Sequence, residues 1–337
     1  MLDWIADTVA RLIAGAFFPL KEFLLDGGSR YFWLYCVTGL VIAAYGYRRH
    51  GTAREFETAL KDKNVWASQS ALNDYAIIVI APMLRLTIFS WTVLNWKTVS
   101  AFTVKTLTSF GVAGTVTDGT AVGLGVVLTL VLFIADDFAR WFMHTIYHRI
   151  PELWEFHKVH HSAEVLNFAT AERHHPVELM TSGAVIALVH GLINGLFIWA
   201  FGDKLTVTTL AGANIFLFGF NIAGGVLRHS PFWISFGPRV ERWVISPAMH
   251  QIHHSDKEQH FDRNMGSSLA IWDRLFGSLH IPQGREVENF GIGPETAEFR
   301  SLAVIYFKPF VAAYGLLQRR FVKAAPRGEA RTSPASA

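Results

Sequence analysis

The sequence predicts an all-α fold: a polytopic membrane helical bundle with about four to five transmembrane helices, further interfacial helices and a cytoplasmic, histidine-rich helical cap. The first observation is composition, because hydrophobic residues make up 51% of the chain and charged residues only 17%. Soluble domains carry about 25% charged residues. The second is a series of apolar runs that approach the roughly 20 residues needed to span a bilayer. The third is that most histidines cluster beside these runs rather than within them.

The N-terminal part begins with an interfacial helix. Residues 1–25 mix charged and apolar side chains, which favours a helix lying in the membrane interface, and they lack the pattern of a cleaved signal peptide. The apolar run 31–45, which can extend through Tyr47, predicts the first transmembrane helix. Arginine and lysine then dominate residues 47–70, so the positive-inside rule places this loop in the cytoplasm.

The next apolar run, residues 74–95, predicts a second span, in which Arg85 needs a partner or must extend to the interface. Residues 97–120 are rich in glycine and threonine, which predicts an irregular or partly re-entrant connection. The run 121–134 begins a third span, which continues into the densest histidine stretch.

Two further apolar runs, 179–201 and 205–227, are separated by only three residues, which predicts an antiparallel transmembrane hairpin. Five spans return the chain to the basic, cytoplasmic side before residue 228, and every clustered histidine lies on that side.

The C-terminal part is more polar. We expect residues 228–300 to form the cap and 302–322 to form an amphipathic helix at the interface. Residues 323–337 are rich in Ala, Pro and Ser and predict a disordered tail. The chain is therefore expected to be a single membrane-embedded catalytic domain over residues 1–322.

Three groups of histidines share helical spacing. His144 and His148 lie four residues apart, and His157, His160 and His161 repeat at three and four, so each group occupies one helix face. Pro151 should break the helix between these groups. His250, His253 and His254 repeat the spacing of the second group. A single chance match has a probability of roughly 0.03 at this histidine content, so coincidence is a poor explanation.

Clustered imidazoles indicate metal binding. Eight histidines exceed the needs of one ion, and imidazole suits Fe, Zn, Cu and Ni. A hydrolytic di-zinc site should recruit carboxylates, which the groups lack, and a bis-histidine haem needs only one histidine per helix. An iron pair that activates O₂ fits best. The single cysteine, Cys36, offers no thiolate site, and we expect His190 to be a hydrogen-bonded core residue.

The three groups resemble the histidine boxes of the fatty acid hydroxylase and sterol desaturase superfamily of integral-membrane di-iron oxygenases. Their order is His144-x-x-x-His148, His157-x-x-His160-His161 and His250-x-x-His253-His254. Further matches are Trp154-Glu155-Phe156, Asn167, Arg173-His174-His175-Pro176-Val177-Glu178, His229-Ser230, Ser246-Pro247, Asp262-x-Asn264-x-Gly266 and Trp272-Asp273-Arg274-Leu275-Phe276-Gly277. The resembling core covers about residues 121–285.

The resemblance implies two iron ions, cycling between Fe²⁺ and Fe³⁺, held by about ten histidines. His229 fits the second position of a His-x-x-x-His pair, but Gly225 stands at the first. His175 is the candidate for the missing ligand, with His174 as the alternative.

Acidic and polar neighbours complete the predicted site. Asp137 lies two helical turns before His144 and is expected to accept the free N–H of a ligand imidazole, the alternative being a charge that faces lipid headgroups. Asn264, in a turn-like motif, is the second candidate catalytic residue. Glu178, Asp262 and Asp273 are partners of the ligands, caps of loops, or partners of Arg173, Arg263 and Arg274.

The predicted activity is O₂-dependent hydroxylation or desaturation of an unactivated C–H bond in a fatty acyl chain, a sterol or a polar lipid. Neither a complete dinucleotide fingerprint nor a haem motif is evident, so electrons should come from a separate ferredoxin or cytochrome b5-type donor with its reductase. No basic stripe indicates nucleic acid. A membrane di-zinc hydrolase and a metal transporter are the alternatives. The expected location is a bacterial inner membrane or an ER-type membrane.

Overall fold

The computed structural model describes residues 2–50, 52–87, 94–111 and 118–324. The α-helices in this part of the chain are α1 (Leu2–Leu25), α2 (Trp33–Arg49), α3 (Ala53–Lys61), α4 (Lys63–Trp66), α5 (Gln69–Thr87), α6 (Trp96–Thr108), α7 (Asp118–Arg149), α8 (Pro151–His161), α9 (Pro176–Phe201), α10 (Ile215–Ile222), α11 (Pro247–His253), α12 (Ile271–Phe276) and α13 (Leu302–Ala324). The 3₁₀ helices are η1 (Phe168–Glu172), η2 (Gly225–His229), η3 (Glu258–His260) and η4 (Gly293–Arg300), and two short strands, β1 (Thr209–Leu210) and β2 (Ala213–Asn214), pair antiparallel. The predicted all-α character is confirmed.

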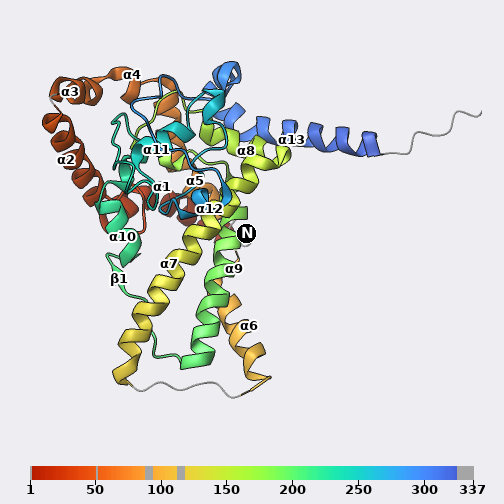
Figure 1. Cartoon of the computed structure of the whole chain (residues 1–337). Coiled ribbons are helices and arrows are strands. Elements are labelled where there is room, and N and C mark those ends of the chain that lie inside the picture. The colour runs from red at the N-terminus through yellow and green to blue at the C-terminus, as the bar shows by residue number, and fades with distance from the viewer. Residues whose placement is uncertain (1, 51, 88–93, 112–117, 325–337) are drawn as a thin grey trace, which may run out of the picture.

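The molecule consists of a compact cap from which long helices project (Figure 1). α7 and α9 run side by side away from the cap, with α6 packed against α9 at the distal end (Figure 1). α13 packs against α8 near its start and then extends away from the body (Figure 1). The short helices α11 and α12 lie in the cap, beside the cap-proximal ends of α7 and α8 (Figure 1).

Two helices of the described chain are long and apolar enough to cross a membrane, over Ala121–Arg149 and Pro176–Phe201. Only 11% of the apolar window of the second is buried, so its hydrophobic side chains face outward rather than into a protein core. Such exposure favours lipid as the surroundings, because soluble proteins rarely expose a continuous apolar surface of this size. The third and fourth predicted helices are therefore confirmed. The full count of five spans is not.

The segment 205–227 does not form the predicted fifth helix. It folds into the β1–β2 turn, the eight-residue α10 and the start of η2. The returning chain instead lies along α7: the Thr208 N–H donates to Thr129 Oγ1 at 2.8 Å, and Asn214 Nδ2 donates to the Thr129 carbonyl at 2.8 Å. Apolar composition alone cannot distinguish a transmembrane helix from an irregular apolar segment that hydrogen-bonds to a neighbouring helix.

The expectation of an irregular connection over 97–120 was also wrong for its first half, where α6 forms. α9 presents Gly191 and Gly195 to it on one face. A Cβ at Gly191 would lie 2.4 Å from Val99 Cβ, and one at Gly195 would lie 2.5 Å from Thr103 Cβ. Small residues four apart thus allow close helix contact of the kind used inside membranes.

The N-terminal predictions are confirmed as helices, although not as spans. α1 covers the proposed interfacial segment and packs against α5, and α2 covers the first predicted span. Arg85 finds a partner within the protein, since its guanidinium lies 4.7 Å from the centre of the Phe18 ring. α13 covers the predicted C-terminal amphipathic helix, whereas residues 325–337 of the predicted tail lie outside the described residues.

A buried ion pair joins α5 to the histidine-bearing core. Arg173 Nη1 lies 2.8 Å from Asp74 Oδ1, and both side chains are almost fully buried. The same guanidinium donates to the carbonyl of Val159 on α8 at 2.8 Å and to Ser162 Oγ at 3.0 Å. Asp74 also accepts from Thr170 Oγ1 at 2.7 Å. This network fixes the second histidine box relative to α5.

We expect Asp74→Ala to destabilise the protein by about 3–5 kcal/mol, because it leaves the Arg173 guanidinium buried without a counter-charge. The thermal midpoint in detergent measures the effect. Glu57→Ala, which removes an exposed carboxylate 3.9 Å from Lys61, is the control and should cost less than about 0.5 kcal/mol. Equal midpoints for the two variants would contradict this role for Asp74.

Candidate metal centre

Four elements bring the histidines together: α7, α8, α11 and η2, which ends at His229. The cap-proximal end of α7 carries His144 and His148, and α8 carries the second group. Pro151 occupies the first turn of α8, where a proline is tolerated, so the predicted break separates α7 from α8. Ser246 caps the start of α11, because its hydroxyl accepts the Met249 N–H at 3.2 Å. α11 carries His250 and His253 of the third group, and His254 follows directly after it.

The imidazoles form two groups in which the potential ligand atoms lie within 4.8 Å of one another. The first group contains His144, His148, His157, His161 and His253. The second group contains His160, His229, His250 and His254. Nine of the ten histidines proposed as ligands from the sequence thus converge, including His229.

The ring Nε2 atoms face one another inside each group. In the first group, His161 Nε2 lies 3.2 Å from the Nε2 atoms of both His148 and His157. In the second group, His250 Nε2 lies 3.0 Å from His229 Nε2 and 3.2 Å from His254 Nε2.

The Nδ1 atoms of five of these histidines face outward and have acceptors. The pairs are His144 with the Met265 carbonyl at 2.8 Å, His148 with Asp262 Oδ1 at 3.1 Å, His157 with Glu178 Oε1 at 2.9 Å, His160 with the Arg173 carbonyl at 3.3 Å and His253 with the Arg263 carbonyl at 2.9 Å. A carbonyl oxygen can only accept, so the Nδ1 atoms facing carbonyls carry the proton and their Nε2 atoms carry a lone pair. This outer hydrogen bonding is typical of metal-binding histidines.

Electrostatics keeps the cluster neutral. Burial, reinforced by the neighbouring imidazoles, lowers the pKa values of six of the clustered histidines well below their usual range. The histidines concerned are His160, His161, His229, His250, His253 and His254. Neutral imidazoles are the form that binds metal.

The donor set fits two metal ions, one in each group. The Nε2 atoms of different rings approach one another to 3.0–3.3 Å, which is the convergence that ligands of a shared cation require. In addition, the Nε2 atoms of His144 and His253 are buried and make no hydrogen bond in the described structure. An all-imidazole set suits iron, zinc, copper or nickel.

His175 lies outside both groups and has a different role. Its Nδ1 accepts the Val177 N–H at 3.1 Å, which caps the start of α9, and its Nε2 donates to the Tyr306 carbonyl at 3.1 Å. Both ring nitrogens are therefore engaged, so the geometry does not fit the expectation that His175 supplies the missing ligand. The alternative, His174, also lies outside the groups and stacks on His160 with ring centres 4.4 Å apart.

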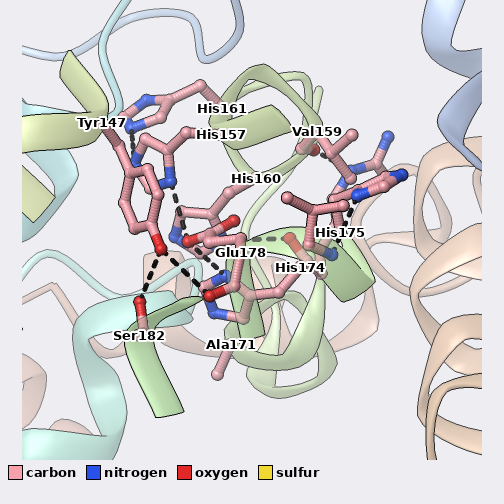
Figure 2. Close-up of polar contacts among 12 residues, drawn as sticks. Tyr147, His157, Val159, His160, His161, Ala171, His174, His175, Glu178 and Ser182 are labelled. Atoms are coloured by element: carbon pink, nitrogen blue, oxygen red, sulfur yellow. Dashed lines mark hydrogen bonds and ion pairs between the residues drawn. The ribbon is translucent and has the colours of Figure 1, made fainter. Parts of the chain in front are cut away.

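Glu178 links His157 on α8 to His174 in the segment just before α9 (Figure 2). Its Oε1 accepts from Nδ1 of His157 at 2.9 Å and from Nδ1 of His174 at 3.0 Å. It thereby fulfils the role of outer partner that the sequence offered for it. Tyr147 stacks beside His157 and directs its hydroxyl to Ser182 Oγ at 2.9 Å (Figure 2).

The two candidate catalytic residues contact the cap rather than the imidazoles. Asp137 accepts the Ser268 N–H at 2.7 Å and Trp272 Nε1 at 2.9 Å, so it does not serve as the expected imidazole partner. Asn264, at φ +55°, exchanges hydrogen bonds with the backbone of His280. Both residues hold the loop whose Met265 carbonyl accepts from His144. They position the site instead of forming it.

Asp74 is a site-supporting residue that the sequence analysis missed. Glu178 was weighed as the partner of Arg173, yet that arginine pairs with Asp74, and its own carbonyl accepts from His160. A carboxylate at the beginning of the apolar run 74–95 was the available signal, because a charge there needs a partner.

Two cavities flank the histidines. A cavity of about 270 Å³ is lined by His144 and His157 of the first group, by His160, His229 and His250 of the second, and by residues of α7 and α9. A second cavity of about 400 Å³ meets the first group from the cap side, at His148, His161 and His253. Separately, His260 and His280 both face Glu286 and form a third, smaller group.

Comparison with known proteins agrees with this centre. Residues 129–278 match the family model described as fatty acid hydroxylase. This part of the chain, slightly less than half of it, belongs to the fatty acid hydroxylase family. The matched region contains all nine clustered histidines.

Several curated relatives share this region. The chain is 26% identical to alkylglycerol monooxygenase of Homo sapiens, over 46% of the chain and 31% of that protein. It is 28% identical to the ornithine lipid hydroxylase OlsE of Rhizobium tropici, over 51% of the chain and 47% of that protein. It is 26% identical to methylsterol monooxygenase 1 of Rattus norvegicus, over 43% of the chain and 44% of that protein. The matches thus span about a third to a half of these relatives, and no solved structure matches significantly.

Metal analysis of the purified protein tests the two-group geometry. We expect two ions per chain, and we expect His161→Ala and His254→Ala each to lower this number because each removes a converging Nε2. His175→Asn is the matched control, since asparagine also caps helices well, and it should retain both ions. Loss of an ion from His175→Asn would instead support His175 as a ligand.

Acid should destabilise the metal-free protein. In the folded protein, the pKa values of clustered histidines such as His161 and His254 lie below their values in the unfolded chain. As the pH falls through about 6.5, the unfolded chain therefore binds more protons than the folded protein, and stability is lost. We expect a lower thermal midpoint at about pH 5.5 than at about pH 7.5. A midpoint that is constant or rises over this range would contradict the neutral, buried cluster.

Proposed function

We propose that the chain is an O₂-dependent membrane oxidoreductase that uses two iron ions to hydroxylate an unactivated C–H bond of a lipid-type substrate. The observation that carries this proposal is the cavity that meets histidines of both groups and lies between α7 and α9. A substrate held there reaches both metal positions while its apolar part lies beside the two helices that can cross the membrane.

The walls of this cavity suit a lipid end. Met143 and Ala139 face it from α7, and Leu179, Gly183 and Ile186 face it from α9. Apolar walls exclude water from the reacting atoms and hold a carbon chain in place.

The chain's own residues prepare the centre for this reaction. Glu178 holds the His157 ring in one orientation, and the carbonyls of Met265, Arg173 and Arg263 hold protons on Nδ1 of His144, His160 and His253. When bound, an iron pair supplies the O₂ activation and the oxidising power that a C–H bond requires. The protein fixes the ligands and positions the substrate carbon.

Hydroxylation is favoured over desaturation by the names of the relatives, which are monooxygenases and a hydroxylase. Desaturation would use the same centre and differ only in how the substrate carbon is positioned. Loss of a second hydrogen in place of oxygen transfer would give the alkene.

Electrons should enter from the cap side, which we place in the cytoplasm. The second cavity reaches His148, His161 and His253 without passing between α7 and α9, and Trp154 and Phe261 also line it. We propose a separate ferredoxin or cytochrome b5-type donor with its reductase. Exposed Arg239 and Arg242 provide positive charge on the cap for an acidic partner.

The two alternatives fit less well. A di-zinc hydrolase would be expected to use carboxylate ligands, whereas both groups consist only of imidazoles and the carboxylates contact them from outside. A transporter would place ligands in mid-membrane. There, His190 on α9 lies 3.2 Å from Asp136 and belongs to neither group.

Comparative lipid mass spectrometry tests the proposal directly. Membranes that contain the iron-loaded protein, O₂ and a reducing system should accumulate a lipid that is heavier by one oxygen atom, and His160→Ala should abolish this product. Full turnover under nitrogen would contradict the oxygenase and support the hydrolase.

Gly183→Phe should block the cavity without unfolding the protein, because a Cβ at this position has no atom within 4 Å. We expect kcat/KM to fall by at least about tenfold while metal content is retained. Gly123→Phe is the matched control, since Gly123 is equally open but lies on α7 outside the cavity. A similar effect of the two substitutions would contradict substrate binding at this place.

A further inference from the structure

Three arginines from separate parts of the chain line the cavity between α7 and α9. Arg30 follows α1, Arg140 lies on α7, and Arg228 lies on η2 directly before the clustered His229. Arginine is an unusual choice for a lipid-facing cavity, because burying a guanidinium without a counter-charge is costly.

Within the part of the chain that the structure describes, Arg140 is the one arginine of the three with a carboxylate partner. Arg140 Nε lies 2.7 Å from Asp136 Oδ2. Arg30 donates only to the Ala171 carbonyl, at 3.4 Å. Arg228 donates to the carbonyls of Gly225 and Ser267, and its guanidinium lies 5.1 Å from the centre of the Phe220 ring. In the described chain, neither Arg30 nor Arg228 makes an ion pair.

The carboxylates near the cavity either accept hydrogen bonds from other groups or form no ion pair with Arg30 or Arg228 in the described chain. Glu178 is bound by His157 and His174, and Asp137 is bound by the backbone of the cap loop. Glu172 lines the cavity but makes no ion pair within 4.0 Å in the described chain. Among the described residues, the guanidinium groups of Arg30 and Arg228 thus have no carboxylate within 4.0 Å.

We propose that this cavity recognises the anionic headgroup of an amphiphile, a phosphate or a carboxylate, through Arg30 and Arg228. A guanidinium presents paired N–H donors that match the oxygens of either anion. The apolar chain then lies along Leu179 and Ile186, between α7 and α9. This inference deepens the proposed function and rests on it for turnover, although binding can be measured separately.

The arrangement also places the reactive carbon. Arg228 is adjacent in sequence to His229, and the cavity, at about 270 Å³, is slightly smaller than the usual range of ligand pockets, which begins near 300 Å³. It therefore holds the polar end of a lipid and the first part of its chain. The oxidised C–H bond should lie near the headgroup rather than far along the acyl chain.

Binding of three matched amphiphiles to the metal-loaded protein in neutral detergent tests the proposal. The probes are dodecyl phosphate, dodecanoate and neutral 1-dodecylglycerol, and the readout is isothermal titration calorimetry. We expect one or both anionic probes to bind at least about tenfold more tightly than dodecylglycerol. Inorganic phosphate should compete only weakly. Equal binding of all three probes would overturn the proposal, and competition by inorganic phosphate as strong as that by dodecyl phosphate would overturn the lipid source of the anion.

Variants separate recognition from general damage. Arg30→Gln and Arg228→Gln should each weaken anionic-probe binding by about tenfold and leave dodecylglycerol within about twofold. Glu172→Gln, which removes the cavity's own unpaired carboxylate, should maintain or strengthen anion binding. Arg54→Gln, at an exposed position on α3, is the control and should change nothing. Dependence on Glu172 with no effect of the arginines would overturn the proposal in favour of a cationic headgroup.

Arg228→Lys keeps the assay informative if the glutamine variant loses its metal. The lysine retains charge but lacks the paired donors, so binding of the anionic probe should be intermediate. Anion binding by a protein that does not oxidise lipid would refute the proposed function but keep this inference. Lipid oxidation with no preference for anionic probes would support the proposed function but refute this inference.

Discussion

The arrangement of the histidine cluster depends on protons held on the outer side of the imidazole rings. Backbone carbonyls and carboxylates accept from Nδ1 of His144, His148, His157, His160 and His253, so that the Nε2 lone pairs point inward. Neutral imidazoles whose lone pairs converge in a buried space are suited to bind cations. The rest of the cap is built to hold these acceptors: Arg173 is fixed by Asp74, and the loop with Met265 is held by Asp137, Asn264 and Asp273. Asp74, Asp137 and Asp273 thus act on the clustered histidines through the backbone, whereas Glu178 and Asp262 accept directly from His157 and His148.

Much of this centre could be predicted from the sequence because helical spacing places i, i+3 and i+4 residues on one face. The break at Pro151 and the long helices α7 and α9 follow from local chemistry. What could not be predicted depends on contacts distant in the chain. Residues 205–227 form no long helix, and their return along α7 is held by Thr129, 79 positions before Thr208, which accepts from the Thr208 N–H and from the Asn214 side chain. α6 forms where Gly191 and Gly195 allow it to approach α9.

The same limitation explains the errors at individual residues. His175 lies in the same sequence motif as His174 and Glu178, which contact the cluster. However, it directly precedes the proline that starts α9, where it caps the helix, and its two ring nitrogens bind the Val177 N–H and the Tyr306 carbonyl. Asp137 has suitable spacing to His144, yet the backbone N–H groups of Ser268 and Leu269 occupy its oxygens. Spacing identifies which residues share a helix face, whereas the partner on the opposite side comes from the tertiary fold.

The two cavities give the centre two separate approaches, one between the membrane-type helices and one from the cap. The most direct test of the central claim is a crystal structure of the iron-loaded protein with anomalous scattering measured at the iron edge. The account predicts two iron peaks, one within each histidine group, each bound through Nε2 atoms. A single peak, or iron bound through Nδ1 or by His175, would contradict it.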